Sequence, residues 1–426
     1  MNLNKNFLAY AAVIIAALLL LTAACGLISA DNEEDRILKV GVLGPFTGRS
    51  ENIGKEFKGA VTMAFDNVDY QIGDYRVELF WIDSQSDAKR AFLNYEEMVV
   101  DEQLDVCILN WHSSVAVVAM DVAARNKLPH FFGFGGTDVI NEKFEYDPEY
   151  YSYYMGKSWP IPEKLTIAYV EALEDAIANE IWDPRNKRVA VYGENTDWGK
   201  SFGAAIAEDF ENAGWEIAGE IYLATGEIEL QPVLNELIEM DAAVIAGSIA
   251  TDPSLAAFIK QADQTNLNSV IIAEGLGWVG EWHEMTGNSA DYVLDQVPSW
   301  TNDGARGFVR DFRDMYGFTP SASSGGLAYD KASFFIQIAE ETLEEYGELN
   351  RETLYEYGRE MLWTGATTYQ GGAVMNEYKY TSETIPDPVV GKNFFIFPVV
   401  QYFEGAGKII WPDAWKVSDF KPPEVK

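Results

Sequence analysis

The chain repeats one pattern of hydrophobic and polar positions: a short apolar run, a polar turn and an amphipathic stretch. In the clearest copy, residues 106–109 are all apolar, 110–114 are largely polar, and apolar residues then recur every three or four positions from Val115. An unbroken apolar run is typical of a parallel strand buried on both faces, and the 3.6-residue period indicates a helix. This copy predicts a strand, a turn at its carboxyl end and a helix that begins in the turn.

Strands and helices of this kind follow one another in two series. The predicted strands of the first series span 37–42, 75–82, 106–109 and 129–134, and those of the second span 188–192, 216–223, 242–246 and 269–273. Strands that alternate with helices form mostly parallel sheets, so we expect an α/β fold of two Rossmann-like lobes. The pattern Gly-Lys-x-Phe-x-x-Ala, at 54–60 and again at 199–205, supports two similarly built lobes.

The segments that join the two series set the expected lobe boundaries. Residues 144–159 are rich in aromatics and follow neither period, which predicts a crossing between the lobes. Helices at 305–315 and 328–345 are expected to return to the first lobe, and strands at 394–402 and 408–411 to end on the second. The expected lobe 1 comprises residues 37–155 and 298–362, and the expected lobe 2 comprises residues 156–297 and 363–426.

The first residues have the pattern of an export signal. Residues 1–24 carry one charge, Lys5, before an apolar core too short for a comfortable membrane span, and they end in small residues before Cys25. This ending resembles a bacterial lipoprotein signal, which predicts that Cys25 becomes a lipid-modified first residue. The alternative is an ordinary secretory cleavage that removes Cys25 or leaves it free. Residues 25–36 are acidic and non-periodic, so we expect a tether to an extracytoplasmic, lipid-anchored protein.

Composition narrows the classes of partner and cofactor. The formal charge of −36 argues against nucleic acid as a partner and suits a salty or alkaline exterior. Cys107, one of two cysteines, falls in a predicted strand and is expected in the core, which leaves no disulfide within the domain. The histidines at 112, 130 and 283 lack the spacing of metal ligands, so no metal site is predicted.

Two motifs resemble those of enzymes, and their surroundings argue against both. Residues 275–280 (GLGWVG) match the dinucleotide-binding pattern, but a bulky tryptophan stands where a pyrophosphate needs room. Residues 199–203 (GKSFG) match the nucleophile elbow of serine hydrolases, and Asp252 and His283 follow in the matching order. Residues 194–198 nevertheless separate that elbow from its strand. We therefore expect a protein that is not an enzyme and has no cofactor, with a serine hydrolase as the lesser alternative.

Polar side chains gather where the predicted strands end, which is the edge at which open α/β sheets bind ligands. Each also has an ordinary structural interpretation as a helix cap, a turn residue, a packing residue or a surface charge. Together, hydroxyls at a helix start opposite a carboxylate would suit a molecule that carries both an anion and a cation. The residues are Trp111, Ser113, Ser114 and Thr137 from the first series, and Ser248, Thr251 and Glu274 from the second.

Across nearly all of the sequence after the signal, the chain resembles the extracellular solute-binding proteins of the leucine/isoleucine/valine-binding type. The resemblance implies a type I periplasmic binding protein, in which two lobes joined by a three-crossing hinge close on a solute and deliver it to an ABC permease. The motifs that carry it are VGVLGPFTG at 40–48, GKEFKGA at 54–60, the serines at 113–114, GGTD at 135–138, NTDWGK at 195–200 and AEG at 273–275.

The resemblance also implies which residues hold the solute. Its carboxylate would be bound by Ser113 and by the turn from Gly135 to Thr137, which fits with a one-residue shift, and Glu274 would take an amino group. Thr251 or its neighbour stands where the family has a tyrosine.

Trp111 and Tyr154, of the aromatic stretch, have no simple counterpart in the family, and we include both as ligand contacts. The expected solute is an amino acid of branched-chain type. Urea, a short amide, an aromatic carboxylate or a sensory role remain the alternatives.

Overall fold

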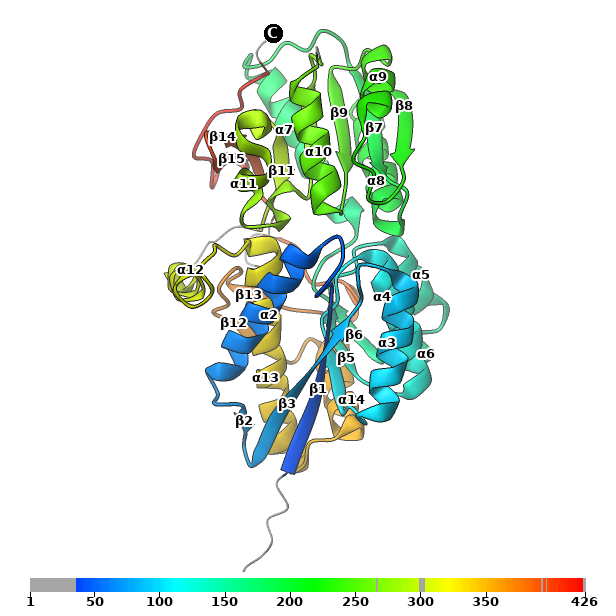
Figure 1. The fold of residues 1–426 in the computed structure, drawn as a ribbon, viewed down its shortest axis with the longest axis vertical. Helices are drawn as coiled ribbons and strands as arrows, with labels where there is room; N and C mark the ends of the chain where they lie inside the picture. The colour runs from blue at the N-terminus through cyan, green and yellow to red at the C-terminus, as the bar shows by residue number, and fades with distance from the viewer. Residues whose placement is uncertain (1–35, 266, 299–302, 392–393, 396, 424–426) are drawn as a thin grey trace, which may run out of the picture.

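The computed structural model describes residues 36–265, 267–298, 303–391, 394–395 and 397–423. The predicted export signal and Cys25 lie outside these residues. Two lobes, each built on its own sheet, are stacked along the long axis of the molecule (Figure 1). Both sheets are mostly parallel, which confirms the expected α/β fold. No helix within the described ranges is long and apolar enough to cross a membrane.

The first lobe contains a six-stranded sheet in the order β2-β3-β1-β4-β5-β6. All neighbours are parallel except β2 and β3, which form an antiparallel hairpin. The strands are β1 (Arg36–Gly44), β2 (Gln71–Ile72), β3 (Tyr75–Asp83), β4 (Val106–Ile108), β5 (His130–Gly133) and β6 (Tyr154–Lys157). The helices between them are α2 (Glu51–Asp66), α3 (Ala88–Asp101), α4 (Ser113–Asn126), α5 (Asp138–Tyr146) and α6 (Pro148–Tyr151).

Helices cover both faces of this first sheet, as the continuous apolar strands require. On one face, α2 packs with α13 (Leu327–Tyr346), and on the other α3 packs with α4 (Figure 1). Residues of β1 alternate between the two cores: Val40 and Val42 face α2, whereas Leu43 faces the α3 side. The sheet is therefore buried on both sides.

The second lobe contains a seven-stranded sheet in the order β15-β14-β11-β10-β9-β7-β8, with only β14 and β15 antiparallel to their neighbours. Its strands are β7 (Arg188–Glu194), β8 (Glu216–Leu223), β9 (Val244–Ser248), β10 (Val270–Glu274), β11 (Leu294–Gln296), β14 (Val399–Phe403) and β15 (Ala406–Trp411). Its helical elements are η1 (Pro162–Lys164), α7 (Ile167–Ala178), α8 (Asp197–Asn212), α9 (Gln231–Glu239), α10 (Asp252–Asp263), η2 (Leu276–Trp278), α11 (Trp282–Thr286) and η3 (Gly287–Ala290).

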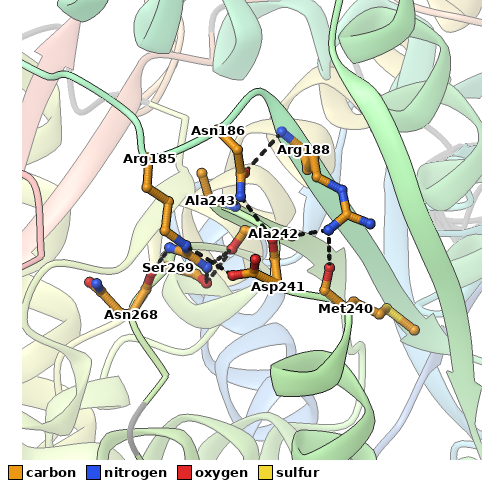
Figure 2. Close-up of polar contacts among 9 residues, drawn as sticks. All are labelled: Arg185, Asn186, Arg188, Met240, Asp241, Ala242, Ala243, Asn268 and Ser269. Atoms are coloured by element: carbon orange, nitrogen blue, oxygen red, sulfur yellow. Dashed lines mark hydrogen bonds and ion pairs between the residues drawn. The ribbon is translucent and has the colours of Figure 1, made fainter.

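Arginine side chains join the amino-terminal ends of three strands in the second lobe. Arg185 donates hydrogen bonds to the backbone carbonyls of Ala242 and Asn268, just before β9 and β10 (Figure 2). Arg188, in β7, donates to the carbonyl of Met240 at 2.8 Å. These bonds satisfy loop carbonyls at the end of the sheet opposite to the strand ends discussed below.

The chain passes between the lobes three times: after β6, after β11 and before β14. Between the last two passages it returns to the first lobe, as expected from the helical patterns at 305–315 and 328–345. The elements of this return are α12 (Asp303–Tyr316), the π-helix η4 (Ala322–Gly326), α13, α14 (Arg351–Thr364), β12 (Tyr369–Gln370) and β13 (Glu377–Tyr378).

Two details differ from the expected boundaries. The segment at 369–378 was expected in the second lobe, but it packs on α13, where Asp330 accepts hydrogen bonds from Val374 N at 2.9 Å and the Tyr378 hydroxyl. The aromatic crossing also contains a strand, β6, which pairs with β5. A four-residue strand with a central glycine is too short to show a period of two.

Candidate ligand-binding site between the lobes

A cavity of about 450 Å³ lies between the lobes, at the carboxyl ends of the strands of both sheets. From the first lobe and the first crossing it is lined by Arg49, Ser86, Asp87, Ala88, Trp111, His112, Ser113, Ser114, Phe134 and Trp159. From the second lobe it is lined by Glu194, Asn195, Thr196, Asp197, Trp198, Lys200, Thr225, Ala250, Thr251 and Trp278. Because both lobes supply the walls, a solute held here would be enclosed when the lobes meet.

Four buried tryptophans dominate the cavity wall. Trp111 follows β4, Trp159 follows β6, Trp198 lies in the first turn of α8, and Trp278 ends η2. The ring centroid of Trp278 lies 5.5 Å from that of Trp111, 5.8 Å from that of Trp159 and 5.7 Å from that of Trp198. Aromatic rings from both lobes and from the crossing therefore meet around one space.

The start of α4 supplies hydrogen-bonding groups from the first lobe. Ser113 and Ser114 line the cavity, and the Ser113 hydroxyl accepts a hydrogen bond from Gly136 N at 3.2 Å. The positive end of the helix dipole faces the same space, which favours an anion there. His112, just before the helix, adopts a φ of 50°. Burial, aided by the charge of Arg49, lowers the pKa of His112 to about 4, so its ring is neutral at pH 7.

Glu194, the last residue of β7, supplies a carboxylate from the second lobe. Its oxygens accept hydrogen bonds from Ala250 N at 3.2 Å and Gly226 N at 3.4 Å. Burial raises the pKa of Glu194, whereas the Thr251 hydroxyl and Arg49 act in the opposite direction. Arg49 itself reaches from the first lobe to the backbone at Gly226. A positive and a negative side chain thus meet at the cavity from opposite lobes.

Glu274 lies at the end of β10, as expected, but it is not part of the cavity wall. The side chain is fully buried, and Oε2 accepts a hydrogen bond from the Tyr169 hydroxyl at 2.6 Å. Burial and the nearby Asp295 carboxyl raise the pKa of Glu274 well above its usual value. The residue that lines the cavity from this loop is Trp278. Glu274 therefore lies behind the cavity wall, and its contact with a solute amino group stays a prediction.

The turn at 135–137 meets the second lobe beside the cavity rather than lining it. The Thr137 hydroxyl lies 3.0 Å from the Ser201 hydroxyl of α8 and also caps α5. Gly135 packs against α4. A Cβ atom at Gly136 would approach the Trp198 ring to 2.5 Å. Ser201, the nucleophile of the hydrolase alternative, is thus engaged in a contact between the lobes.

Of three other predicted residues, Thr251 lines the cavity, whereas Tyr154 and Ser248 do not. Thr251 lines it together with Trp111, Ser113 and Ser114. Tyr154 lies within the first lobe, where its hydroxyl donates to Asn110 Oδ1 at 3.0 Å. Ser248 is buried behind the wall and accepts a hydrogen bond from Trp198 Nε1 at 2.6 Å, which orients that ring.

Lining residues that sequence reasoning missed include Arg49, Trp159, Glu194, Trp198 and Trp278. Glu194 stands directly after a predicted strand, and Trp198 belongs to the motif at 195–200, so both carried a positional signal. Arg49 and Trp159 lie in irregular segments, and only the packing of the lobes brings them to the cavity.

Comparisons with known proteins agree with this architecture. Residues 37–383 match the family model described as a periplasmic binding protein. A curated relative, Leu/Ile/Val-binding protein homolog 6 of Brucella suis, is 23% identical over 234 residues, or 55% of this chain. The match covers 56% of that relative, so the chain spans about half the length of the curated relatives it matches.

Two solved structures have the same fold. A leucine-binding protein of Thermotoga maritima has a TM-score of 0.70 at 18% identity, covering 87% of this chain and 97% of its own. A solute-binding protein of an ABC transporter from R. palustris, solved in complex with benzoate, has a TM-score of 0.69 at 16% identity, covering 88% and 95%.

Proposed function

Since the chain belongs to the periplasmic binding protein family, we propose that it is an extracytoplasmic receptor, not an enzyme, that binds a small solute between its lobes and delivers it to an ABC permease. The observation that carries the proposal is the cavity whose wall is shared by the two lobes. A solute that contacts both lobes favours the closed form over the open form, which is how binding would be linked to recognition by a permease.

The solute we propose carries a carboxylate. The start of α4, with Ser113 and Ser114, is suited to an anion, and the names of the relatives support an amino acid of branched-chain type. The four tryptophans favour a second candidate, an aromatic carboxylate, in keeping with the benzoate bound by the R. palustris protein. Urea or a short amide would leave the anion site unfilled.

A thermal-shift screen of the chain from residue 26 tests this proposal. The compounds are amino acids, amides and aromatic carboxylates at equal concentration. A solute present at one hundred times its Kd stabilises the folded state by about 2.7 kcal/mol, so at least one carboxylate is expected to raise the Tm. The same compound should lose this effect in the Trp278→Ala variant. No shift with any compound would contradict the proposed function.

Two alternative functions are a sensory receptor and a serine hydrolase. A sensory receptor would bind the solute in the same cavity, and uptake of the labelled solute by cells with and without the permease separates transport from sensing. A serine hydrolase would need a free Ser201, and labelling by a fluorophosphonate probe that is lost in Ser201→Ala would favour it.

We further propose that Cys25 anchors the protein to the membrane through a lipid. The support is the run of small residues before Cys25 that follows the apolar stretch. The Cys25→Ala variant is expected to move from the membrane fraction to the soluble fraction of cells. A variant that stays in the membrane fraction would exclude this anchor.

A further inference from the structure

The tryptophans of the cavity form a box rather than a stack. The plane of Trp278 makes angles of 87° with Trp111, 79° with Trp159 and 57° with Trp198. None of these three pairs is parallel, so the rings do not form two stacked walls around a flat slot. Walls at steep angles present ring faces and edges from several directions, which suits a rounded group, and a cation gains attraction from the ring faces.

The remaining apolar lining does not resemble a pocket for a branched aliphatic side chain. Among the described residues, the apolar lining other than the tryptophans consists of Phe134, Ala88 and Ala250. Leucine, isoleucine, valine and methionine are absent from it. An aliphatic side chain would gain only from burial against these walls, whereas a cation would also be attracted by the faces of the tryptophan rings.

Two of the carboxylates considered for a primary amine, Glu194 and Glu274, are already engaged in hydrogen bonds. A primary ammonium group has three N–H donors, and an enclosed one needs acceptors for them. Both oxygens of Glu194 already accept backbone hydrogen bonds, and Glu274 is bound to Tyr169 away from the wall. A fully methylated ammonium group needs no acceptor and gains from the negative charge of Glu194 at a distance.

The same cavity is well supplied with groups that bind a carboxylate. Ser113 and Ser114, at the start of α4, line the cavity together with the cationic side chains of Arg49 and Lys200. A ligand with a carboxylate at one end and a bulky cation at the other would use both sets of groups.

We propose that the solute is a betaine-type zwitterion, in which a methylated ammonium group lies in the tryptophan box near Glu194 and a carboxylate meets the start of α4. This inference rests on the proposed receptor function and names the class of its solute. It assigns recognition of the cation to Trp111, Trp159, Trp198 and Trp278 together with Glu194, in place of the expected Glu274.

The test compares glycine betaine with its isostere 3,3-dimethylbutanoate, in which an uncharged carbon replaces the ammonium nitrogen, by calorimetric titration of the full-length protein. The two have the same shape and the same carboxylate, so their difference isolates the positive charge. Glycine betaine is expected to bind at least tenfold more tightly. Equal affinity, or tighter binding of the isostere, would overturn the inference.

Matched variants test which residues bind the cation. Trp278→Leu is expected to weaken betaine binding at least tenfold and Trp278→Phe less, whereas Glu194→Gln weakens it several-fold. Glu274→Gln keeps the size of a side chain that lies behind the wall, bonded to Tyr169 and Trp278, and should weaken binding less than Glu194→Gln does. If Glu274→Gln weakens binding more than Glu194→Gln does, the assignment of the cation site is wrong.

Leucine and benzoate complete the titration and separate two kinds of failure. If either binds and glycine betaine does not, the betaine inference fails and the receptor function stands. If no compound binds to the folded protein, the receptor function fails as well.

Discussion

At the scale of single residues, Glu56 of α2 connects the two lobes. Its Oε1 accepts a hydrogen bond from Gly280 N of the second lobe at 2.9 Å. Its Oε2 accepts from Ser321 N at 2.7 Å, the Ser324 hydroxyl at 2.5 Å and Gly325 N at 3.1 Å, all at the π-helix before α13. Complete burial raises the pKa of Glu56 from 4.5 to about 7, although the four donors act to lower it.

The raised pKa predicts a pH dependence of stability. Because the folded state prefers the protonated form, this contribution is fully present below pH 4.5 and is lost as the pH rises through about 7. Between pH 5 and pH 8 the wild type should lose on the order of 3 kcal/mol of unfolding free energy relative to Glu56→Gln, which cannot ionise. Urea unfolding at both pH values measures this difference.

Glu51→Gln is the control, since Glu51 lies on the same helix with an exposed side chain. Its pH profile should run parallel to that of the wild type. Burial lowers the pKa of His112 and His130, so both residues reduce the unfolding free energy as the pH falls. Both are present in all three proteins, and their effect therefore cancels in the comparison. Parallel profiles for wild type and Glu56→Gln would contradict the assignment.

Glu194 and Glu274 show which features of the site the sequence could predict and which it could not. Glu194 and Glu274 both end strands of the second lobe, and position alone favours neither. The hydroxyl of Tyr169, which follows the first crossing, holds Glu274 inside the lobe, and Trp278 takes the place on the wall. Such a choice depends on packing between segments about a hundred residues apart, which no local pattern records.

At the scale of elements, the turn before α5 meets the start of α8 across the lobe interface. Gly136 lies against the rings of Trp159 and Trp198, and a Cβ atom there would meet Trp159 at 3.0 Å and Trp198 at 2.5 Å. The adjacent contact between Thr137 and Ser201 adds a hydrogen bond between the lobes. Closure therefore requires a residue without a side chain at this position.

Gly136→Ala is expected to disfavour closure without unfolding either lobe. Overpacking of this kind costs about 1–3 kcal/mol, which corresponds to roughly 5- to 150-fold weaker solute binding. Calorimetric titration with the solute found in the thermal-shift screen measures the loss. In the control Gly307→Ala, on α12, the new Cβ meets no atom within 4 Å, and affinity should stay within twofold. Wild-type affinity in Gly136→Ala would show that this contact plays no part in closure.

Sequence patterns predicted strands with long apolar runs better than they predicted strands of two to four residues. Apolar runs of four or more residues became β4, β7, β9 and β10, because a strand buried on both faces needs such a run. The strand β6 was missed because its four residues carry no period. The segment with β12 and β13 was placed on the wrong lobe because its position is set by Asp330, a single buried side chain of α13.

At the scale of the whole molecule, both sheets direct their carboxyl strand ends at one shared cavity. The two lobes could be predicted from the repeat of strand and helix patterns, and the motifs at the strand ends placed the site between them. The four tryptophans come from four separate segments of the chain, and only the packing of the two lobes against each other brings their rings together.

A crystal structure of the protein with its tightest-binding solute tests the central claim most directly. The account predicts solute density between the rings of Trp111 and Trp278, in contact with Ser113 or Ser114 on one lobe and with second-lobe residues on the other. A solute bound outside this cavity, or held by one lobe alone while the other makes no contact, would contradict it.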